Sequence, residues 1–369
     1  MIVITTLNIV VVFIAYLARL EKHRYLLVWA FILLILVLGI RYGYGNDFFN
    51  YKYIFKHGAY EAETGDEDYG WLILNRVFFP IGFSSLVFFL TVLEHLMLYD
   101  LIRRYVSPHY YWLALFIYLF NPYFMLIGLS MMRQFLVQIL GFYVIEYVYK
   151  RKFIHFAALI IVCVSIHKIG LLLIPLALFP FASRISYGKK TILLFTVIGV
   201  FSFFFLITRM DSIIEGLIEF FAEYDMKYGN SYLNASAIGE EERLNPKMLL
   251  RYAIYVFLLI RNFKFLSETN ASRYFAIVVI FGTLFIPFAT ISQMAMRVSW
   301  IYSFVVIVAL PLLLREERIP IIKYGSIFFI LILLLREYEG FFISEIYSKY
   351  YANFHTIFSE YAIYDITMY

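Results

Sequence analysis

Long apolar runs alternate along this chain with short groups of charged residues. A helix that crosses the hydrocarbon core of a bilayer needs roughly 20 mainly apolar residues, or somewhat fewer where polar ends reach the headgroups. By this measure the pattern predicts about 12 membrane-spanning helices. Their expected ranges are 2–18, 25–40, 83–101, 110–128, 131–149, 153–167, 169–183, 191–207, 248–260, 273–291, 297–314 and 319–335. The sixth and seventh ranges nearly touch, so a re-entrant hairpin is an alternative for that pair.

Composition points the same way. The chain of 369 residues is 63% hydrophobic, 21% aromatic and only 15% charged, which an ordinary soluble domain does not tolerate. We therefore expect an all-α, polytopic transmembrane helix bundle that forms one domain over residues 1–369. The first apolar segment has no basic region before it and no small-residue cleavage site after it, so it predicts a retained helix. The lone Cys163 lies in an apolar run and is expected to serve packing.

Basic residues collect in alternate loops, and this predicts the orientation of the chain. With both termini outside, the inner loops carry 17 of the 31 Lys and Arg residues but seven of the 26 acids. The densest clusters on that side are Arg103-Arg104, Lys150-Arg151-Lys152 and Lys189-Lys190. The inverted topology is the alternative. A net charge of +5 spread over such clusters is what membrane topology requires and does not indicate nucleic acid.

Two outer loops are long enough to carry function. Residues 41–82 begin with RYGYGNDFFNYKYIF and end with EDYGWLILNRVFFP, whose apolar positions predict a short helix in the membrane interface. Residues 208–247 contain a helical apolar face opposite several acids, which predicts a second helix along the membrane surface. The tail from Arg336 is rich in Tyr and Phe and is expected to be interfacial as well.

Isolated cationic positions at the predicted outer face indicate a site, because a fixed charge next to the bilayer is costly. They are Arg41, Arg133, Lys168 and Arg297. Guanidinium groups bind phosphate oxygens bidentately and stay protonated, so such a group of cations suits a lipid pyrophosphate. Each position also has a simpler explanation as an anchor that reaches the headgroups or as a polar turn.

Three further residues complete the expected site. Asp47 or His167 is the candidate general base that takes a proton from a sugar hydroxyl. Tyr51 is one of several outer tyrosines that offer ring faces and hydroxyls to sugars, although tyrosines at this depth also form membrane-interface belts. Alternatively, the Asp47 carboxylate only neutralises the charge of Arg41 and has no catalytic role. The Glu94-His95 pair is expected near the inner interface rather than in a proton relay.

Four segments carry a family resemblance: RYGYGNDFFNYKYIF, MRQFLVQIL, IHKIGLLLIPLALFP and MRVSWIYSF. With them, the chain from about residue 25 to 315 resembles the EpsG family of Wzy-type polymerases of O-antigens, capsules and exopolysaccharides. The resemblance implies a C-type glycosyltransferase-like membrane fold and metal-independent, cofactor-free transfer of glycan from one undecaprenyl diphosphate to another. The family's recurrent polar positions map to Arg41, Gly45, Asp47, Tyr51, Arg133, His167, Lys168 and Arg297.

One family motif departs from its usual order. The acid that precedes a glycine and an aromatic residue before the third span is represented here by Glu67 and Asp68, followed by Tyr69, Gly70 and Trp71. The role of that acid is therefore left open.

The resemblance also implies partners and a location. The expected partners are undecaprenyl-diphosphate-linked glycans, a chain-length regulator and a flippase, and the expected location is the bacterial cytoplasmic (inner) membrane with the active site on the periplasmic face. Three other functions stay open: an O-antigen ligase, a lipid-linked glycan flippase or transporter, and a membrane O-acyltransferase that uses His167. A transporter would place its polar residues through the bundle centre, whereas here they gather at one face.

Overall fold

The structure is a computed structural model that describes residues 1–57, 68–178, 246–262 and 293–360, together with residues 274, 275, 278, 279, 282 and 362. Within these residues the fold is almost entirely helical, as the apolar pattern predicts. The helices of the first half are α1 (Ile2–Leu17), α2 (Leu26–Gly39), α3 (Phe48–His57), α4 (Tyr69–Phe78), α5 (Phe83–Tyr105), α6 (Tyr111–Phe120), α7 (Leu126–Ser130), α8 (Met132–Tyr149) and α9 (Phe153–Ile166).

The second half is built in the same way. A 3-10 helix, η4 (Lys168–Leu178), follows α9 directly. The later helices are α14 (Pro246–Asn262), α17 (Gln293–Ser303), α18 (Val306–Glu316), α19 (Pro320–Ile343) and α20 (Glu345–Tyr351). Short 3-10 turns, η1 (Glu21–His23), η2 (Phe79–Ile81) and η3 (Pro108–Tyr110), join some of the helices. In the described residues one antiparallel sheet pairs β1 (Arg41–Tyr42) with β2 (His355–Thr356).

Two helical stretches of the described chain are long and apolar enough to cross a membrane by themselves, Phe83–Tyr105 and Ser299–Glu316. Several others are apolar but shorter, such as Ile2–Leu17 and Leu26–Gly39. The count of about 12 spans therefore stays a prediction. The expected span 191–207, the surface helix in 208–247 and most of the span 273–291 lie outside the described residues.

The expected span 110–128 is broken in the structure, and the sequence gives the reason. Proline disfavours helical backbone in the residue before it, and Asn121 precedes Pro122. Asn121 accordingly has extended dihedral angles and ends α6 at Phe120. Its side-chain oxygen accepts a hydrogen bond from the backbone N–H of Tyr123 at 3.1 Å, and the helix resumes as α7.

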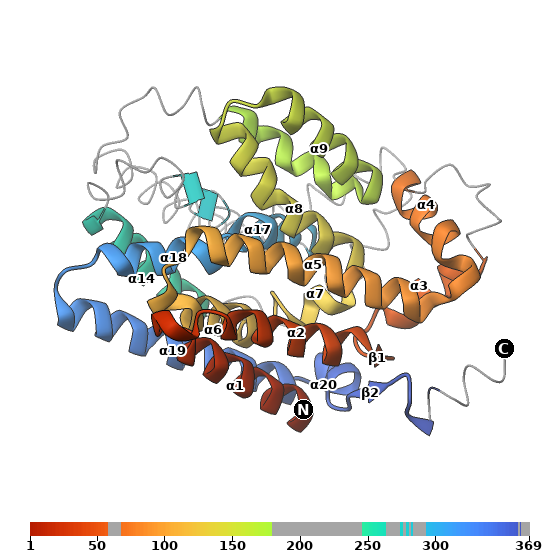
Figure 1. Ribbon diagram of the computed structural model, residues 1–369, viewed down its shortest axis with the longest axis horizontal. Coiled ribbons are helices and arrows are strands. Elements are labelled where there is room, and N and C mark those ends of the chain that lie inside the picture. Colours follow the sequence, from red (N-terminus) through yellow and green to blue (C-terminus); the bar gives the residue numbers. More distant parts are fainter. Residues whose placement is uncertain are drawn as a thin grey trace, which may run out of the picture.

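The helices pack side by side in an elongated bundle. In Figure 1, α1, α2 and α5 run next to one another along the long axis of the molecule. The elements β1, α3, α4, α20 and β2 gather at one end of the bundle, and the connection between α18 and α19 lies at the opposite end (Figure 1). We call the first of these the β1 end. The short helix predicted near residue 70 is present there as α4.

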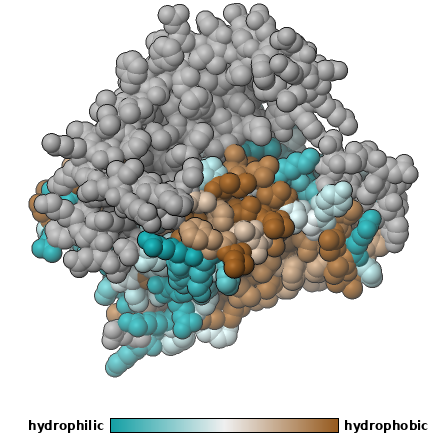
Figure 2. Space-filling model, turned by 90° about the horizontal axis from the view of Figure 1, so that it is seen from above, coloured by the Kyte–Doolittle hydropathy of each residue, from teal (hydrophilic) through white to brown (hydrophobic). Residues whose placement is uncertain are grey.

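Many large apolar side chains lie on the outer surface of the bundle. Ile154, Ile321 and Phe328 are 84%, 81% and 59% exposed. Figure 2 shows hydrophobic residues gathered in a broad patch across one face, with hydrophilic residues beside it. Apolar patches of this kind are rare on soluble monomers and suit contact with lipid tails.

Ion pairs mark the end of the bundle far from β1. Arg104, in the last turn of α5, bonds to Asp100 at 2.6 Å and to Glu146 of α8 at 2.7 Å. Arg261 of α14 bonds to Glu317 at 2.6 Å. These basic residues belong to the loops that are predicted to face the cytoplasm.

Candidate functional site

Segments far apart in the sequence bring polar side chains together at the β1 end. They are the loop after β1, the helix α3, the first turns of α4 and α8, the turn between α9 and η4, and the helix α17. We call this group the cationic site, and its members are Asp47, Tyr51, Asp68, Trp71, Arg133, His167, Lys168 and Arg297.

Arg133, in the first turn of α8, lies at the centre of the cationic site. Its Nη1 donates a hydrogen bond to Oδ2 of Asp68 at 2.9 Å. The guanidinium carbon lies 5.5 Å from the ring centre of Tyr51 and 5.9 Å from that of Trp71, within the range of cation–π attraction. Its Nε is buried and has no hydrogen-bond partner among the described residues. Arg133 is thus held on three sides, and its partly exposed side chain stays open to an anion.

The first turn of α4 explains the motif that sequence reasoning left open. Asp68 immediately precedes α4, and its side chain is only 8% exposed where it meets Arg133. Burial raises the pKa of Asp68, and the charges of Arg133 and Lys168 oppose that rise. A Cβ on Gly70 would lie 2.5 Å from Oγ of Ser165, so only glycine lets α4 approach α9 this closely. Trp71 then packs edge to face on Tyr51, with ring centres 5.4 Å apart.

Asp47 is held by the loop between β1 and α3. Its backbone N–H donates to Oγ of Ser130 at 3.1 Å, and the Asn46 amide donates to its Oδ1 at 3.3 Å. Burial raises the pKa of Asp47, whereas the positive charges of Arg297 and Arg133 lower it. The cations that act on this carboxylate are therefore those of the cationic site. Arg41, which sequence reasoning offered as its partner, lies elsewhere.

His167 and Lys168 form the turn between α9 and η4. Nδ1 of His167 accepts a hydrogen bond from the backbone N–H of Ile169 at 3.0 Å, so the proton of the neutral ring lies on Nε2. The charges of Arg133, Arg297 and Lys168 all act on the His167 ring. Lys168 is exposed and also acts on Asp68. The turn thus contributes a ring N–H donor and an exposed cation to the site.

Arg41 is the one predicted site residue that the structure places apart from the others. It is 2% exposed, and its guanidinium donates to Leu38 O at 2.8 Å, to Thr91 Oγ1 at 2.7 Å and to Leu129 O at 3.2 Å. The charge of Glu94 also acts on it. Its Nε is buried without a partner among the described residues, and the burial of the whole side chain closes Arg41 to a diphosphate.

The Glu94-His95 pair was expected near the inner interface, and this expectation is wrong. Both residues lie near the middle of α5 and are buried, at 2% and 0% exposure. Nδ1 of His95 lies 2.8 Å from Thr91 O, and its Nε2 lies 3.1 Å from the Tyr118 hydroxyl. Helix packing, which the charge pattern does not reveal, draws these groups into the core around Arg41.

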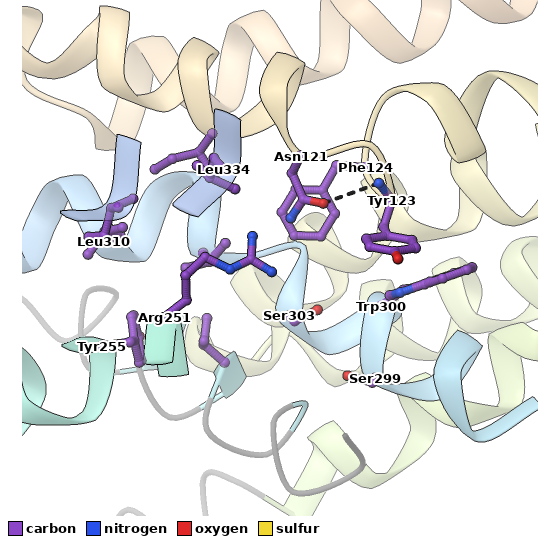
Figure 3. Close-up of a pocket in the computed structure, with 14 residues that line it drawn as sticks. Asn121, Tyr123, Phe124, Arg251, Tyr255, Ser299, Trp300, Ser303, Leu310 and Leu334 are labelled. Atoms are coloured by element: carbon purple, nitrogen blue, oxygen red, sulfur yellow. Dashed lines mark hydrogen bonds between the residues drawn. The ribbon is translucent and has the colours of Figure 1, made fainter. Parts of the chain in front are cut away.

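An apolar pocket adjoins the cationic site through α17, on which Trp300 follows Arg297 by one helical turn. The lining comes from α6 and the loop after it, from α14, α17, α18 and α19, and from Val279 (Figure 3). Trp300 stacks on Tyr123 with ring centres 5.4 Å apart, and its Nε1 is buried without a hydrogen-bond partner among the described residues. Arg251, which bonds to Glu337 at 2.9 Å, supplies the charged group of the lining.

Sequence reasoning missed several residues around Asp47. Ser130 stands three residues before Arg133, yet a serine in an apolar run gives little signal. Asn46 lies in this loop next to Asp47, and Tyr351, which bonds to Asn46, belongs to a tail that matched no motif. Among the described residues no three His, Cys, Asp or Glu side chains are placed to hold a metal ion.

Fold and site together define a helical membrane protein whose cationic, carboxylate-bearing site lies at one end of the bundle. The family model of the EpsG family matches residues 24–356, nearly the whole chain. This chain belongs to the EpsG family, and the resemblance seen in its motifs is confirmed. The family is one of membrane proteins of the polysaccharide-polymerase type, with glycosyltransferase-like activity. No curated protein and no solved structure matches the chain.

Proposed function

We propose that this protein is a polysaccharide polymerase of the bacterial cytoplasmic membrane. It transfers glycan from an undecaprenyl-diphosphate-linked chain to a lipid-linked repeat unit at the periplasmic face. The observation that carries the proposal is the placement of Asp47 under the charges of Arg133 and Arg297, at the end of an apolar helix bundle. A carboxylate beside several cations suits a reaction that accepts a proton and releases an anion.

The cations bind the leaving group. Arg133, Lys168 and Arg297 hold the diphosphate of the donor, whose negative charge grows as the glycosidic bond breaks. Asp68 holds Arg133 in a fixed orientation, and the Tyr51 and Trp71 rings lie within cation–π distance of its guanidinium. Fixed guanidinium groups stabilise the developing charge without reorganising during the reaction. Tyr51 thereby acts on the diphosphate through Arg133.

Asp47 is the general base, and His167 is a hydrogen-bond donor. The acceptor hydroxyl oxygen bonds to the anomeric carbon, the bond from that carbon to the diphosphate oxygen breaks, and the hydroxyl proton passes to the Asp47 carboxylate. Attack from the face opposite the leaving group inverts the anomeric centre. His167 uses Nδ1 to accept the Ile169 N–H, so Nε2 carries the ring proton and donates it in a hydrogen bond to the diphosphate.

The apolar pocket receives the first isoprene units of the donor lipid. Its lining is mainly apolar, and on α17 it begins at Ser299, two residues beyond Arg297. A diphosphate on Arg297 and Arg133 therefore has an apolar recess next to the carbon that joins it to the lipid chain. The rest of the chain lies in the bilayer. This placement favours a lipid-linked donor over a soluble nucleotide sugar.

An O-antigen ligase is the alternative that shares this chemistry, because it also releases a lipid diphosphate and differs in its acceptor. A flippase is less well supported, because the polar residues of the site lie at one end of the bundle. A chain-length regulator and a flippase in the same membrane are the proposed protein partners.

Glycan analysis in a deletion strain tests the proposal. The strain is complemented with the wild-type protein, Arg133→Ala, Asp47→Asn or the control Arg336→Ala, whose side chain is 67% exposed. Arg133→Ala and Asp47→Asn should abolish long glycans and leave single-repeat lipid intermediates, while the control restores the ladder. Normal ladders from either site variant at normal protein level would overturn the proposal. Free polymer in the deletion strain would indicate a ligase, and loss of all surface glycan a flippase.

A further inference from the structure

We propose that the C-terminal segment formed by α20 and β2 is a positioning element for Asp47. The inference rests on the proposed function only in taking Asp47 as the general base. The segment lies about 300 residues beyond the loop that it contacts, and Figure 1 shows both at the same end of the bundle. The match to the EpsG family runs to residue 356 and so includes it.

Backbone hydrogen bonds join the segment to the strand that leads into the Asp47 loop. In the sheet, Arg41 pairs with Thr356 and Tyr42 pairs with His355. Backbone hydrogen bonds flank the sheet on both sides, since Ile357 N–H donates to Ile40 O at 2.9 Å and Gly45 N–H donates to O of Tyr350, in α20, at 3.3 Å. The tail thus holds residues 40–45 along their length.

Side chains extend the contact to the Asp47 carboxylate. Tyr351 is fully buried and donates its hydroxyl hydrogen to Oδ1 of Asn46 at 3.3 Å. Ser130 of α7 donates to the same Oδ1 at 2.7 Å and accepts the backbone N–H of Asp47 at 3.1 Å. Asn46, fixed by both donors, donates its own amide to Oδ1 of Asp47 at 3.3 Å. Tyr351 and Ser130 therefore orient the amide that orients the base.

The loop needs this support because of its own sequence. Gly43 and Gly45 adopt positive φ angles of 63° and 102°, which glycine reaches at no steric cost but which it does not hold by itself. Tyr44 is buried between two rings of the tail, with ring centres 5.3 Å from Tyr351 and 5.2 Å from Phe354. Displacement of a catalytic base by about 1 Å can lower the reaction rate on the order of 100-fold. Contacts that hold the loop in place should therefore raise kcat.

The test uses full-length protein in lipid nanodiscs with a lipid-linked repeat unit as substrate. The variants are Tyr351→Phe and Ser130→Ala. The matched control is Tyr350→Phe, because the Tyr350 side chain is exposed and the substitution keeps the backbone carbonyl that bonds to Gly45. We expect kcat to fall about fivefold for Tyr351→Phe and about 30-fold for Ser130→Ala, with KM for the lipid within about twofold. Because both act through Asn46, the double variant should lose less than the product of the two effects.

Other outcomes are equally decisive. Wild-type kcat for both variants would overturn the positioning role, and so would a loss of kcat that follows a fall in thermal stability of the purified protein. If Asp47→Asn is itself fully active, the proposed function fails. If Asp47→Asn is inactive while Tyr351→Phe and Ser130→Ala match the control, only the positioning role fails. The pH at which kcat is half-maximal should also change in Ser130→Ala and not in Tyr350→Phe, because the orienting amide bonds to the base.

Discussion

Arg133 and Asp68 are 65 residues apart in the sequence and form a hydrogen-bonded ion pair of 2.9 Å at the β1 end of the bundle. The pair joins the start of α8 to the start of α4. Asp68 is the more buried partner, at 8% side-chain exposure against 25% for Arg133. Asp68 therefore fixes the direction of the guanidinium without closing the site to an anion.

Removal of Asp68 should weaken catalysis more than folding. In Asp68→Ala the Arg133 side chain loses its fixed partner, so we expect kcat/KM for the lipid-linked donor to fall about tenfold. Asp68→Asn keeps an acceptor oxygen of the same shape, and its loss should be smaller. Steady-state kinetics in nanodiscs measure both. The control is Glu339→Ala, which removes an exposed partner of Arg336. Equal kinetics for Asp68→Ala and this control would contradict the role of the pair.

At low pH, the dependence of kcat on pH should follow the protonation of the Asp47 carboxylate. Burial raises the pKa of Asp47 above the usual range of an aspartate, and Arg297 and Arg133 hold that rise in check. A general base acts when deprotonated, so kcat should increase as pH rises through this pKa. In Arg297→Ala one restraining charge is lost, the pKa rises further, and this increase in kcat should move to higher pH. An increase that stays in place or moves to lower pH would exclude Asp47 as the titrating group.

Much of the helical framework could be predicted from the apolar pattern. The ranges 2–18, 25–40 and 131–149 agree within about two residues with α1, α2 and α8, because length and hydropathy define a helix locally. The break at Asn121-Pro122 was not predicted, because the apolar run continues through it, although the proline marks the position. The order of the predicted spans places Asp47, Arg133 and Arg297 at the same membrane face, so the sequence predicts that they form one group.

Contacts between distant segments were not predictable from a single sequence. The burial of Arg41 depends on how α5 and α7 pack around it, and its spacing from Asp47 pointed to the wrong neighbour. The hydrogen bond from Tyr351 to Asn46 spans 305 positions, and no local pattern marks either residue. Such contacts arise from tertiary packing and leave no periodic trace in the chain.

Arg41 should matter for stability, in contrast to Arg133. Arg41→Ala removes three hydrogen bonds that a buried guanidinium donates, and a hydrogen bond to a charged group contributes about 1.5–3 kcal/mol. We expect thermal unfolding of the purified protein at a clearly lower temperature. Arg133→Ala should unfold within a few degrees of the wild type, because Arg133 is partly exposed. Equal unfolding temperatures for the two variants would argue against the buried role of Arg41.

The pocket beside Arg297 leads to a prediction about donor chain length. Ser303 lines the pocket on α17, and Ser303→Trp should fill part of the space that the proposed function gives to the isoprene units. We expect KM to rise about tenfold for a donor with a long polyprenyl chain, with kcat nearly unchanged, because the lost contacts contribute to binding rather than to the transition state.

A donor with a single short isoprenoid chain supplies the comparison. If the pocket holds the lipid, this analogue should bind the wild-type protein more weakly than the long donor, and Ser303→Trp should reduce that difference. Tyr350→Phe, at a residue that does not line the pocket, should leave the preference for the long chain unchanged. An unchanged preference in Ser303→Trp protein with wild-type thermal stability would place the lipid elsewhere, since the added indole would then occupy space that the substrate does not use.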